Sequence, residues 1–404
     1  MSIHNSNSKI SDLAIISLLN LLKDSGPLSQ VELSNLSGYS RSTVSINCDK
    51  LLLSGYIVPV DNNAGQKKNI GLCLNKDFGC VIGIGMGGSC CSVALCDFEG
   101  NVLDLKTFST DLLCGPEPIL ELICHYIDIQ LKENISQSPL YGIGMGIPSP
   151  VKYEIGTAFH PAFMPGWHLY PIKDYLQSRY KCPTFVDNEV NTLALREYAE
   201  LQESSCKVLL CIKVGTGIGA GIIINRNIYR GENGEGGNIG HIQVEGNQLL
   251  CTCGKVGCIE SVASIPAIEQ QATEMAQKNT ESILYEIYKQ KQHISITDIR
   301  EATNKGDRYA LEIIKEAGIN LGNLLGKITV FLDPGKIIIT GRISCLGPIY
   351  LDYIRREILK QASPWTGTDF TIEFSQLTDN TPATGAALLC IDELFAQQLI
   401  ISKL

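Results

Sequence analysis

Residues 236–260 read GGNIGHIQVEGNQLLCTCGKVGCIE and contain the most specific pattern in the chain. His241, Cys251, Cys253 and Cys258 follow the spacing H-x9-C-x-C-x4-C. Three thiolates and one imidazole form a donor set that suits tetrahedral Zn²⁺, and the interleaved glycines let the loop close around an ion. Because these residues would supply all four ligands, we predict a structural zinc rather than a catalytic one. The alternative interpretation is three unrelated buried cysteines beside a single histidine.

The other cysteines need no special explanation. Most of them lie among Val, Ile and Leu, as Cys80, Cys96 and Cys211 do, and we interpret them as small buried apolar residues. The only early apolar run, residues 13–22, is too short to span a bilayer and lacks the basic start and cleavage site of a signal peptide. We therefore expect a cytoplasmic protein with reduced thiols and no membrane insertion.

Charge is divided unevenly along the chain. The 404 residues include 33 Lys+Arg and 42 Asp+Glu, a formal net charge of −9, and 44% are hydrophobic. These values describe a globular chain of two or three domains and exclude a uniformly basic nucleic-acid-binding protein. Residues 1–76 nevertheless carry seven Lys or Arg and five Asp or Glu, which gives +2 and leaves −11 for residues 77–404. A domain boundary is predicted near Lys76.

The first 76 residues have the pattern of a winged helix-turn-helix domain. Apolar residues recur at helical spacing over residues 13–22. A second short helix is predicted after Ser29, with the acidic residue of a capping box three positions later, and a third after Ser40. Two strands follow, over residues 56–60 and 70–74. This order of helices and hairpin is typical of winged helix-turn-helix domains.

From residue 77 onward, predicted strands alternate with predicted helices, which indicates an α/β region too long for one lobe. The strands are expected at 81–84, 92–96, 141–147, 208–214, 219–224 and 337–340, and the helices at 118–133, 188–200, 259–275, 307–331 and 382–399. The Gly-rich stretches 83–88 and 215–221 resemble each other, which suggests a duplicated lobe.

Two kinds of candidate ligand site occur in this α/β region. The Gly-rich turns 82–89 and 214–221 can present backbone N–H groups to a phosphate, although glycine clusters also mark ordinary hairpins and close strand packing. The segment VDNEVN, residues 186–191, places carboxylate and amide groups between a strand and a helix. Such groups bind sugar hydroxyls, and a carboxylate there can act as a base, but acids at a helix start are also simple caps.

Together with other short motifs, these stretches resemble the ROK family, which groups bacterial sugar-responsive repressors with sugar kinases. The motifs are GIGMGIPSPV at 142–151, DNEVN at 187–191, GTGIGAG at 215–221, the His/Cys segment at 236–260, TGRI at 340–343 and ATGAA at 383–387. The resemblance covers residues 78–400 and implies a two-lobed fold with a sugar in the cleft. Residues 28–34 and 39–45 are similar to the DNA-binding head of the repressors, which the kinases lack.

The resemblance implies a fold class and a division of the chain. The fold class is α/β, with an N-terminal winged helix-turn-helix followed by a two-lobed actin-like (ribonuclease H-like) domain of the sugar-kinase type. We expect the DNA-binding domain at 1–76, one effector lobe at 77–198 plus 385–404, and a second lobe with the zinc loop at 199–384.

The sugar contacts implied by position in the family motifs are Asn188, Glu189, Asn238, His241 and Glu260. His241 would contact the sugar from the zinc site, with the metal fixing the orientation of its ring. Asn238 stands where the family has Glu, so a neutral amide replaces a charged acceptor. This departure should weaken or redirect the recognition of sugar hydroxyls.

Other departures affect phosphoryl transfer. Kinases of the family have Asp where this chain has Gly85, and Asp as the base where it has Glu189. Gly offers no group to a metal–phosphate arrangement, and an extra methylene can displace a base by about an ångström, which costs on the order of 100-fold in rate. The turn at Thr340-Gly341 also lacks the Gly-Gly pair that usually passes close to the nucleotide. The chain is therefore predicted not to be an enzyme, and Glu in the base position looks like the xylose-repressor branch.

The favoured hypothesis is a sugar-responsive transcriptional repressor that acts as a homodimer or higher oligomer, because a head of +2 binds DNA poorly alone. Contacts with operator DNA are expected from the third helix and the wing, through Ser40, Arg41, Ser42, Thr43, Ser45, Lys67 and Lys68. One alternative is an active ATP-dependent ROK sugar kinase with a fused DNA-binding head. The other is a sensor that a protein partner, rather than a sugar, removes from DNA.

Overall fold

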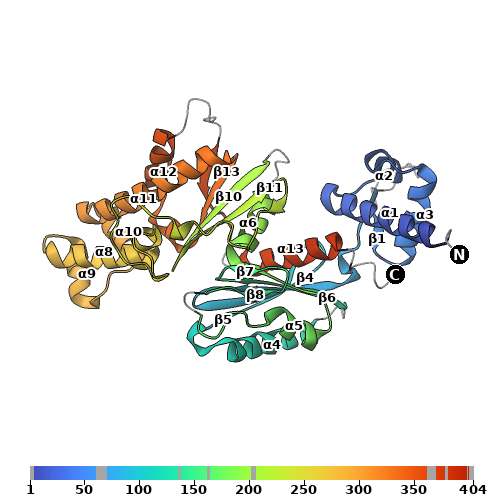
Figure 1. The fold of residues 1–404 in the computed structure, drawn as a ribbon, viewed down its shortest axis with the longest axis horizontal. Coiled ribbons are helices and arrows are strands. Elements are labelled where there is room, and N and C mark those ends of the chain that lie inside the picture. Colours follow the sequence, from blue (N-terminus) through green and yellow to red (C-terminus); the bar gives the residue numbers. More distant parts are fainter. Residues whose placement is uncertain are drawn as a thin grey trace.

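The computed structural model describes residues 4–60, 71–134, 138–161, 164–201, 206–361, 370–377, 381–397 and 399. It contains an N-terminal head and two five-stranded sheets, each with helices on its faces (Figure 1). Within those described ranges, no helix is both long enough and apolar enough to cross a membrane.

The head has the order of elements expected from the sequence. It consists of α1 (His4–Ser25), α2 (Gln30–Ser37), α3 (Arg41–Leu53) and the antiparallel hairpin of β1 (Ile57–Val60) and β2 (Gly71–Leu74). The predicted capping box starts α2: the Ser29 N–H donates to Glu32 Oε2 at 2.8 Å, and the Glu32 N–H donates to Ser29 Oγ at 3.3 Å. Gly38 ends α2 with a φ of 74°, which permits the tight turn into α3.

The first sheet has the strand order β5-β4-β3-β6-β9. The strands are β3 (Cys80–Met86), β4 (Cys90–Cys96), β5 (Val102–Ser109), β6 (Leu140–Ile147) and β9 (Thr184–Asn188). Strands β3, β6 and β9 are parallel, whereas β4 and β5 form an antiparallel meander with β3. Helices α4 (Pro116–Glu133) and α5 (Ile172–Tyr180) cover one face, and α13 (Thr381–Ala396) covers the other (Figure 1).

Glycine at alternate positions of β3 and β6 brings α13 into direct backbone contact with the first sheet. A Cβ atom added at Gly144 would lie 1.8 Å from the carbonyl oxygen of Ala386, and one added at Gly83 would lie 2.0 Å from that of Ala383. Residues between the glycines, such as Ile84, point to the opposite face and are fully buried against α4. The same strands therefore support a side-chain core on one face and a close helix on the other.

The second sheet repeats this strand order as β12-β11-β10-β13-β14. The strands are β10 (Val208–Val214), β11 (Ile218–Ile224), β12 (Asn227–Ile228), β13 (Lys336–Thr340) and β14 (Thr371–Phe374). Helix α6 (Glu189–Glu200) packs on one face of the second sheet and also contacts α13. The other face is covered by α7 (Glu260–Ala263), α8 (Ile265–Lys278), α9 (Ile283–Lys291), α10 (Ile296–Asn304), α11 (Arg308–Leu332) and α12 (Pro348–Gln361).

The helix predicted over 259–275 is in fact two helices. Ser264 ends α7 and caps α8, where its Oγ accepts from the Ala267 N–H at 3.4 Å. Pro266 lies in the first turn of α8, a position where its missing N–H costs nothing. The Ser-Ile-Pro sequence therefore starts a new helix, and the single-helix prediction is wrong at this point.

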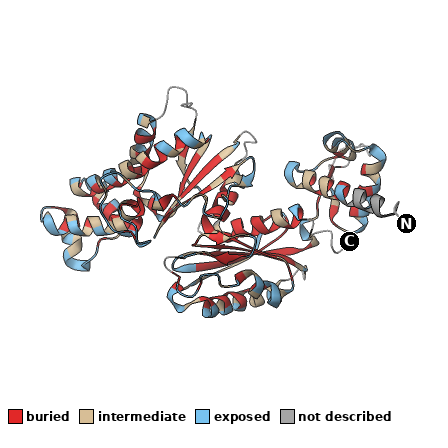
Figure 2. Cartoon of the chain, viewed as in Figure 1, coloured by how far each residue is buried: buried red, intermediate tan, exposed pale blue. Residues whose placement is uncertain are grey.

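Burial follows the layers: the central strands of both sheets are buried, while the edge strand β5 and the outer helices are partly exposed (Figure 2). The head is joined to this arrangement by a cluster of aromatic rings. Tyr56 lies 4.0 Å from Phe78 between ring centroids, and Phe78 lies 5.2 Å from Tyr141 on β6. Phe98 continues the cluster to Phe395 on α13, at 6.4 Å. The head thus packs on the first sheet and on the C-terminal half of α13.

Replacing Gly144 with Ala should strongly destabilise the fold, because the new Cβ would overlap a backbone carbonyl that cannot move without shifting α13. We expect the free energy of unfolding to fall by about 2–3 kcal/mol or more in urea denaturation. Gly335→Ala is the matched control, because its nearest neighbours would be 3.9 Å from the added atom, and it should change stability by no more than about 0.5 kcal/mol. Equal losses for both variants would contradict the close contact.

Candidate functional site

A cavity of about 1100 Å³ lies between the two sheets. The first sheet and the start of α6 contribute Ser149 and Glu189 to its wall, and the second sheet contributes Lys213 and Thr216. All five side chains predicted to contact a sugar line this one cavity, namely Asn188, Glu189, Asn238, His241 and Glu260. The structure therefore brings these residues together; that they bind a sugar stays a prediction.

Asn188 and Glu189 stand at the start of α6. The Asn188 Oδ1 accepts from the Val190 N–H at 2.8 Å, which caps the helix, and its Nδ2 donates to the Ser149 carbonyl at 2.9 Å. Glu189 is only 7% exposed. Its Oε1 lies 2.5 Å from Nζ of Lys213 on β10, whereas its Oε2 has no hydrogen-bond partner among the described residues. Within the described residues, one oxygen of the Glu189 carboxylate therefore has a partner and the other has none.

Glu260 and Asn238 form the opposite part of the wall. The Glu260 Oε2 accepts from the backbone N–H of Ile218 at 3.0 Å, and its Oε1 accepts from Thr252 Oγ1 at 3.5 Å. These contacts hold the buried carboxylate against the Gly-rich turn between β10 and β11. Asn238 is exposed and forms no side-chain cap on the short 3-10 helix 239–241, so its amide is available to a ligand.

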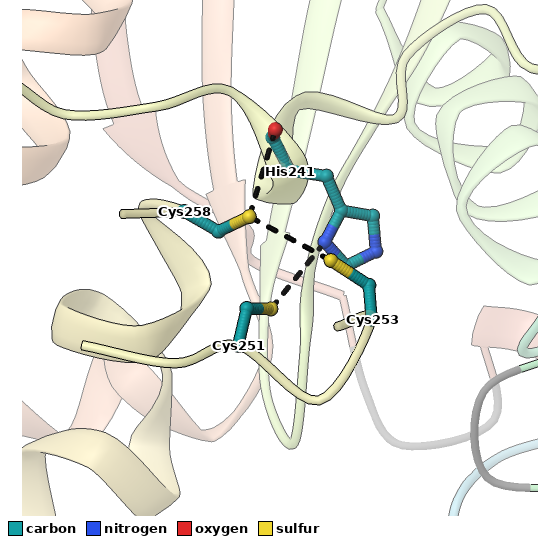
Figure 3. A group of neighbouring side chains, drawn as sticks. All are labelled: His241, Cys251, Cys253 and Cys258. Atoms are coloured by element: carbon teal, nitrogen blue, oxygen red, sulfur yellow. Dashed lines mark hydrogen bonds between the residues drawn. The ribbon is translucent and has the colours of Figure 1, made fainter. Parts of the chain in front are cut away.

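His241, Cys251, Cys253 and Cys258 converge on one point beside the cavity (Figure 3). Their ligand atoms all lie within 4.8 Å of one another. The Cys251 Sγ is 3.7 Å from His241 Nδ1, and the Cys253 and Cys258 Sγ atoms are also 3.7 Å apart. Two thiolates bound to a tetrahedral zinc at about 2.3 Å lie about 3.8 Å apart, so the spacing and chemistry of the donors fit Zn²⁺.

The electrostatics of the cluster are compatible with a bound cation. Burial, together with hydrogen bonds to the Cys253 and Cys251 thiols, raises the pKa of Cys258 to about 12. A cation between the sulfur atoms would stabilise their thiolate forms. Because Nδ1 of His241 faces the thiols, Nε2 is the nitrogen left for a ligand in the cavity.

The predicted DNA-contacting residues lie at the start of α3. Arg41 and Ser42 are exposed, whereas Thr43 and Ser45 are half-buried. The exposed Ser40 accepts from the Thr43 N–H at 3.2 Å, so it serves as the cap of the helix. Lys67 and Lys68, predicted for the wing, lie outside the described residues.

Comparison with known protein families accounts for both parts of the chain. The ROK family profile matches residues 81–393. The chain belongs to the ROK family. A profile described as winged helix-turn-helix DNA-binding matches residues 12–58, which correspond to α1 through the start of β1. This ROK protein therefore carries an N-terminal DNA-binding head.

Individual relatives include both repressors and kinases. The chain is 28% identical over 387 residues to a xylose repressor of Caldicellulosiruptor bescii, covering 94% of this chain and 95% of that one. It is 34% identical over 296 residues to a glucokinase of Halalkalibacterium halodurans, covering 72% of this chain and 89% of the kinase. The crystal structure of a ROK family transcriptional regulator, a homologue of the E. coli MLC protein, has a TM-score of 0.84 and 25% identity, covering 97% of this chain and 98% of that one.

Beneath the cavity of this ROK protein, Asp187 has a structural role. It is 2% exposed and accepts from the Asn188 N–H, Asn191 Nδ2 and Arg230 Nε, each at 2.7 Å. The guanidinium of Arg230 also lies 3.7 Å from the ring centroid of Tyr153. Burial raises the pKa of Asp187, and the positive charge of Arg230 opposes that shift. The helix cap is Asn188, so Asp187 is an ion-pair partner rather than a cap.

Three residues of interest were missed by the sequence analysis: Ile46, Lys213 and Arg230. Ile46 is 58% exposed in the middle of α3, where an apolar side chain can contact a thymine methyl. Lys213 had a sequence signal, because it is the single charged residue in the otherwise apolar strand 208–214. Arg230 lies in a polar loop and had none, since only folding brings it to Asp187.

Replacing Arg230 with Leu should leave Asp187 buried without its counter-charge, at a cost of about 3–5 kcal/mol in unfolding free energy near pH 8. The loss should be smaller at pH 5, because Asp187 can be buried in its protonated form at the lower pH and stability then falls as the pH rises. Urea denaturation at both pH values measures this. Arg226→Leu is the control: Arg226 is 56% exposed and 3.4 Å from Asp24, so it should cost at most about 1 kcal/mol. A pH-independent loss would contradict the role given to Asp187.

Proposed function

We propose that this ROK protein is a sugar-responsive transcriptional repressor. Its head binds operator DNA, and a sugar bound in the cavity between the two sheets releases it. The observation that carries the proposal is the path of α13. One end of this helix lies against Gly85 in β3, three residues before Gly88 of the cavity wall, and a Cβ added at Gly85 would be 2.5 Å from Pro382. Its other half contacts the head, where Asp392 is 2.5 Å from Lys23 Nζ.

The coupling between sugar and DNA would run through α6 and α13. A sugar in the cavity touches the start of α6 and the second sheet together, so it favours one relative orientation of the two sheets. Because the head packs on Phe395 and pairs with Asp392, a change in α13 changes the position of the head. Binding then shifts the population towards an arrangement that no longer fits the operator.

Two heads are needed for tight operator binding. The head has a formal net charge of +2 and is attached to a region with a net charge of −11, so phosphate contacts alone add little to its affinity for DNA. We therefore propose a homodimer, or a higher oligomer, on a two-fold symmetric operator. Arg41, Ser42 and Ile46 would contact base edges or phosphates from α3, and Ser40 would act mainly by fixing the start of that helix. Such a repressor acts in the cytoplasm, where the DNA is.

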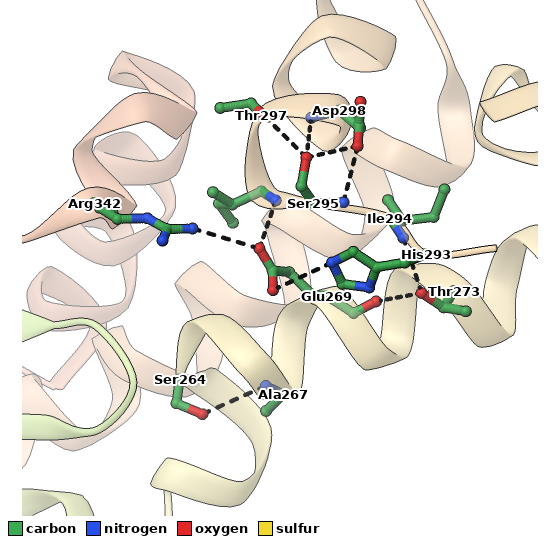
Figure 4. A network of polar contacts seen from close by, with 11 residues as sticks. Ser264, Ala267, Glu269, Thr273, His293, Ile294, Ser295, Thr297, Asp298 and Arg342 are labelled. Atoms are coloured by element: carbon green, nitrogen blue, oxygen red, sulfur yellow. Dashed lines mark hydrogen bonds and ion pairs between the residues drawn. The ribbon is translucent and has the colours of Figure 1, made fainter. Parts of the chain in front are cut away.

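We further propose that the chain is not a kinase. A side chain at residue 85 would collide with Pro382 and with the Ala383 N–H group at 2.6 Å, so the start of α13 fills the space that an Asp would need. On the second sheet, Arg342 follows Gly341 and its Nη2 lies 3.8 Å from Glu269 Oε1 (Figure 4). The same Glu269 oxygen accepts from the Ile296 N–H at 2.9 Å. The exposed side chain of Arg342 thus lies next to Gly341, where the kinases usually have a Gly-Gly pair close to the nucleotide.

The domain limits expected from the sequence fit this function and are kept as a proposal: the head at 1–76, one lobe at 77–198 plus 385–404, and the other at 199–384. The proposed boundary at residue 198 falls inside α6, and the one at residue 385 falls inside α13. Both helices lie between the two sheets. These two helices are better described as the shared hinge of the lobes than as parts of one lobe.

The chain should retard DNA from upstream of its own gene in a gel-shift assay, and a sugar should reverse the retardation. D-xylose, D-glucose and N-acetyl-D-glucosamine are the sugars to test. Arg41→Ala should weaken operator binding by about 1–3 kcal/mol, or roughly 5- to 150-fold. Arg308→Ala, at another exposed arginine, at the start of α11, should leave the affinity unchanged.

Two results would contradict this function. One is the absence of any retardation at low salt. The other is release of ADP from ATP and Mg²⁺ with any of these sugars at about 1–100 s⁻¹, the usual range of kinases.

We propose that the His/Cys cluster holds one structural Zn²⁺ per chain. The ion would cross-link residues 241–258 and fix the His241 ring at the cavity wall. Elemental analysis should find one zinc per chain, and Cys253→Ser should lower both the zinc content and the melting temperature. Cys114→Ser, at another exposed cysteine, is the control and should change neither. A zinc-free protein with an unchanged melting temperature and sugar response would contradict the proposal.

A further inference from the structure

Lys213 forms an ion pair with Glu189 in the wall of the cavity. Glu189 begins α6 and adjoins the last strand of the first sheet, whereas Lys213 lies near the end of β10 in the second sheet. The Nζ–Oε1 distance is 2.5 Å, and the Lys213 side chain is 24% exposed. No motif of the family assigned a role to this lysine. Any role of Lys213 in ligand binding rests on the proposed function, because the ligand would occupy the same cavity.

The pair keeps unused hydrogen-bonding capacity on both sides. A lysine ammonium has three donors, and the carboxylate of Glu189 is the only protein group paired with that of Lys213 within the described residues. The Oε2 of Glu189 is buried and has no partner in the described part of the chain. A buried acceptor without a partner costs about as much as a lost hydrogen bond, and a donor group of a ligand in the cavity would satisfy Glu189 Oε2.

We propose that Lys213 is a sugar-contacting residue that, together with Glu189, forms hydrogen bonds to one hydroxyl of the ligand. A hydroxyl is both an acceptor and a donor, so it can accept from the Lys213 ammonium and donate to Glu189 Oε2. One hydroxyl then bridges the start of α6 and the second sheet. The ligand class is an unphosphorylated sugar, because a phosphate ester at that position has no proton to donate and brings negative charge to a buried carboxylate.

The charges around the cavity agree with this class. Lys213 is the only Lys or Arg among the described residues of the cavity wall, and it is already paired. The same wall carries the acidic residues Asp111, Glu235 and Glu260 as well as Glu189. A phosphorylated sugar would therefore enter a region of net negative charge in which the described wall offers no unpaired Lys or Arg to receive it.

Isothermal titration calorimetry on the full-length protein tests the role of Lys213. The ligand is the sugar, among D-xylose, D-glucose and N-acetyl-D-glucosamine, that binds the wild type most tightly. Lys213→Met should weaken its binding about 10- to 100-fold, since a hydrogen bond to a charged group is lost. Lys336→Met is the matched control: it removes a lysine paired with Glu373 at 2.8 Å on the same sheet, away from the cavity, and should bind the sugar like the wild type.

A series of singly deoxygenated analogues of that sugar identifies the hydroxyl without relying on the stability of a variant. In the wild type, one position should lose about 10-fold or more in affinity when its hydroxyl is removed. In Lys213→Met the same removal should cost little, because the two changes delete one shared interaction and are not additive. The corresponding phosphate ester should bind the wild type at least 10-fold more weakly than the free sugar.

The outcomes separate this inference from the proposed function. The role of Lys213 is wrong if Lys213→Met binds the sugar as tightly as the wild type does. It is also wrong if the losses of affinity from deoxygenation and from Lys213→Met add at every position. In both cases the sugar-responsive repressor stands. Tighter binding of a phosphate ester than of the free sugar overturns the ligand class. If the wild type retards its operator but binds none of the sugars, both the sugar step of the proposed function and this inference fall together.

Discussion

Two helices that touch without side chains between them, α6 and α13, hold the whole effector region together. A Cβ atom added at Gly385 of α13 would lie 2.0 Å from the carbonyl oxygen of Thr192 on α6. The contact extends to both sheets, because a Cβ at Gly221 would lie 2.3 Å from the Val190 carbonyl of α6, and one at Gly144 1.8 Å from Ala386 of α13. Backbone packed this closely tolerates little change, so relative movement of the sheets has to pivot about these helices.

The cavity and the head are attached to the two ends of this pair of helices. Glu189 is the first residue of α6, so its carboxylate is fixed by the helix start and lies where the two sheets meet. On α13, Asp392 pairs with Lys23 of the head, and Glu393 lies 3.9 Å from Arg230, which in turn holds Asp187 beside the cavity. A ligand at Glu189 and the head at Asp392 therefore act on the same rigid elements. This is a physical reason for coupling rather than mere proximity.

Local rules in the sequence predicted the head and the main strands correctly, because those features depend on neighbouring residues. The capping box at Ser29, the αL glycine at 38 and the apolar runs of β3, β6 and β10 each formed where expected. The His/Cys cluster was also predictable, since ligand spacing within one loop is a local property. The helix break at Ser264 was missed because apolar periodicity continued through it, although Pro266 was a signal for a new helix start.

Long-range pairing is what the sequence did not reveal. Arg230 and Asp187 are separated by 43 residues, and nothing near either one specifies the other. Glycine alternation in β3 and β6 was visible in the sequence, but its meaning depends on α13, which comes more than 200 residues later and packs on both strands. Lys213 was visible as a charge in an apolar strand, yet only the fold shows that it faces Glu189. Motifs identified the family and the wall of the cavity, whereas the pairs Arg230–Asp187 and Lys213–Glu189 became visible only in the structure.

The Glu189–Lys213 pair also suits a cavity that binds a sugar. Glu189 Oε1 lies 2.5 Å from the lysine ammonium, so Oε2 and the remaining donors of Lys213 stay available to a ligand hydroxyl. Lys213 belongs to the second sheet, whereas Glu189 begins α6 directly after β9 of the first sheet. The free energy of holding a hydroxyl between them therefore depends on how the start of α6 is oriented relative to the second sheet. A ligand shifts a conformational equilibrium only by its difference in affinity between the two states, and a contact between α6 and the second sheet can supply such a difference.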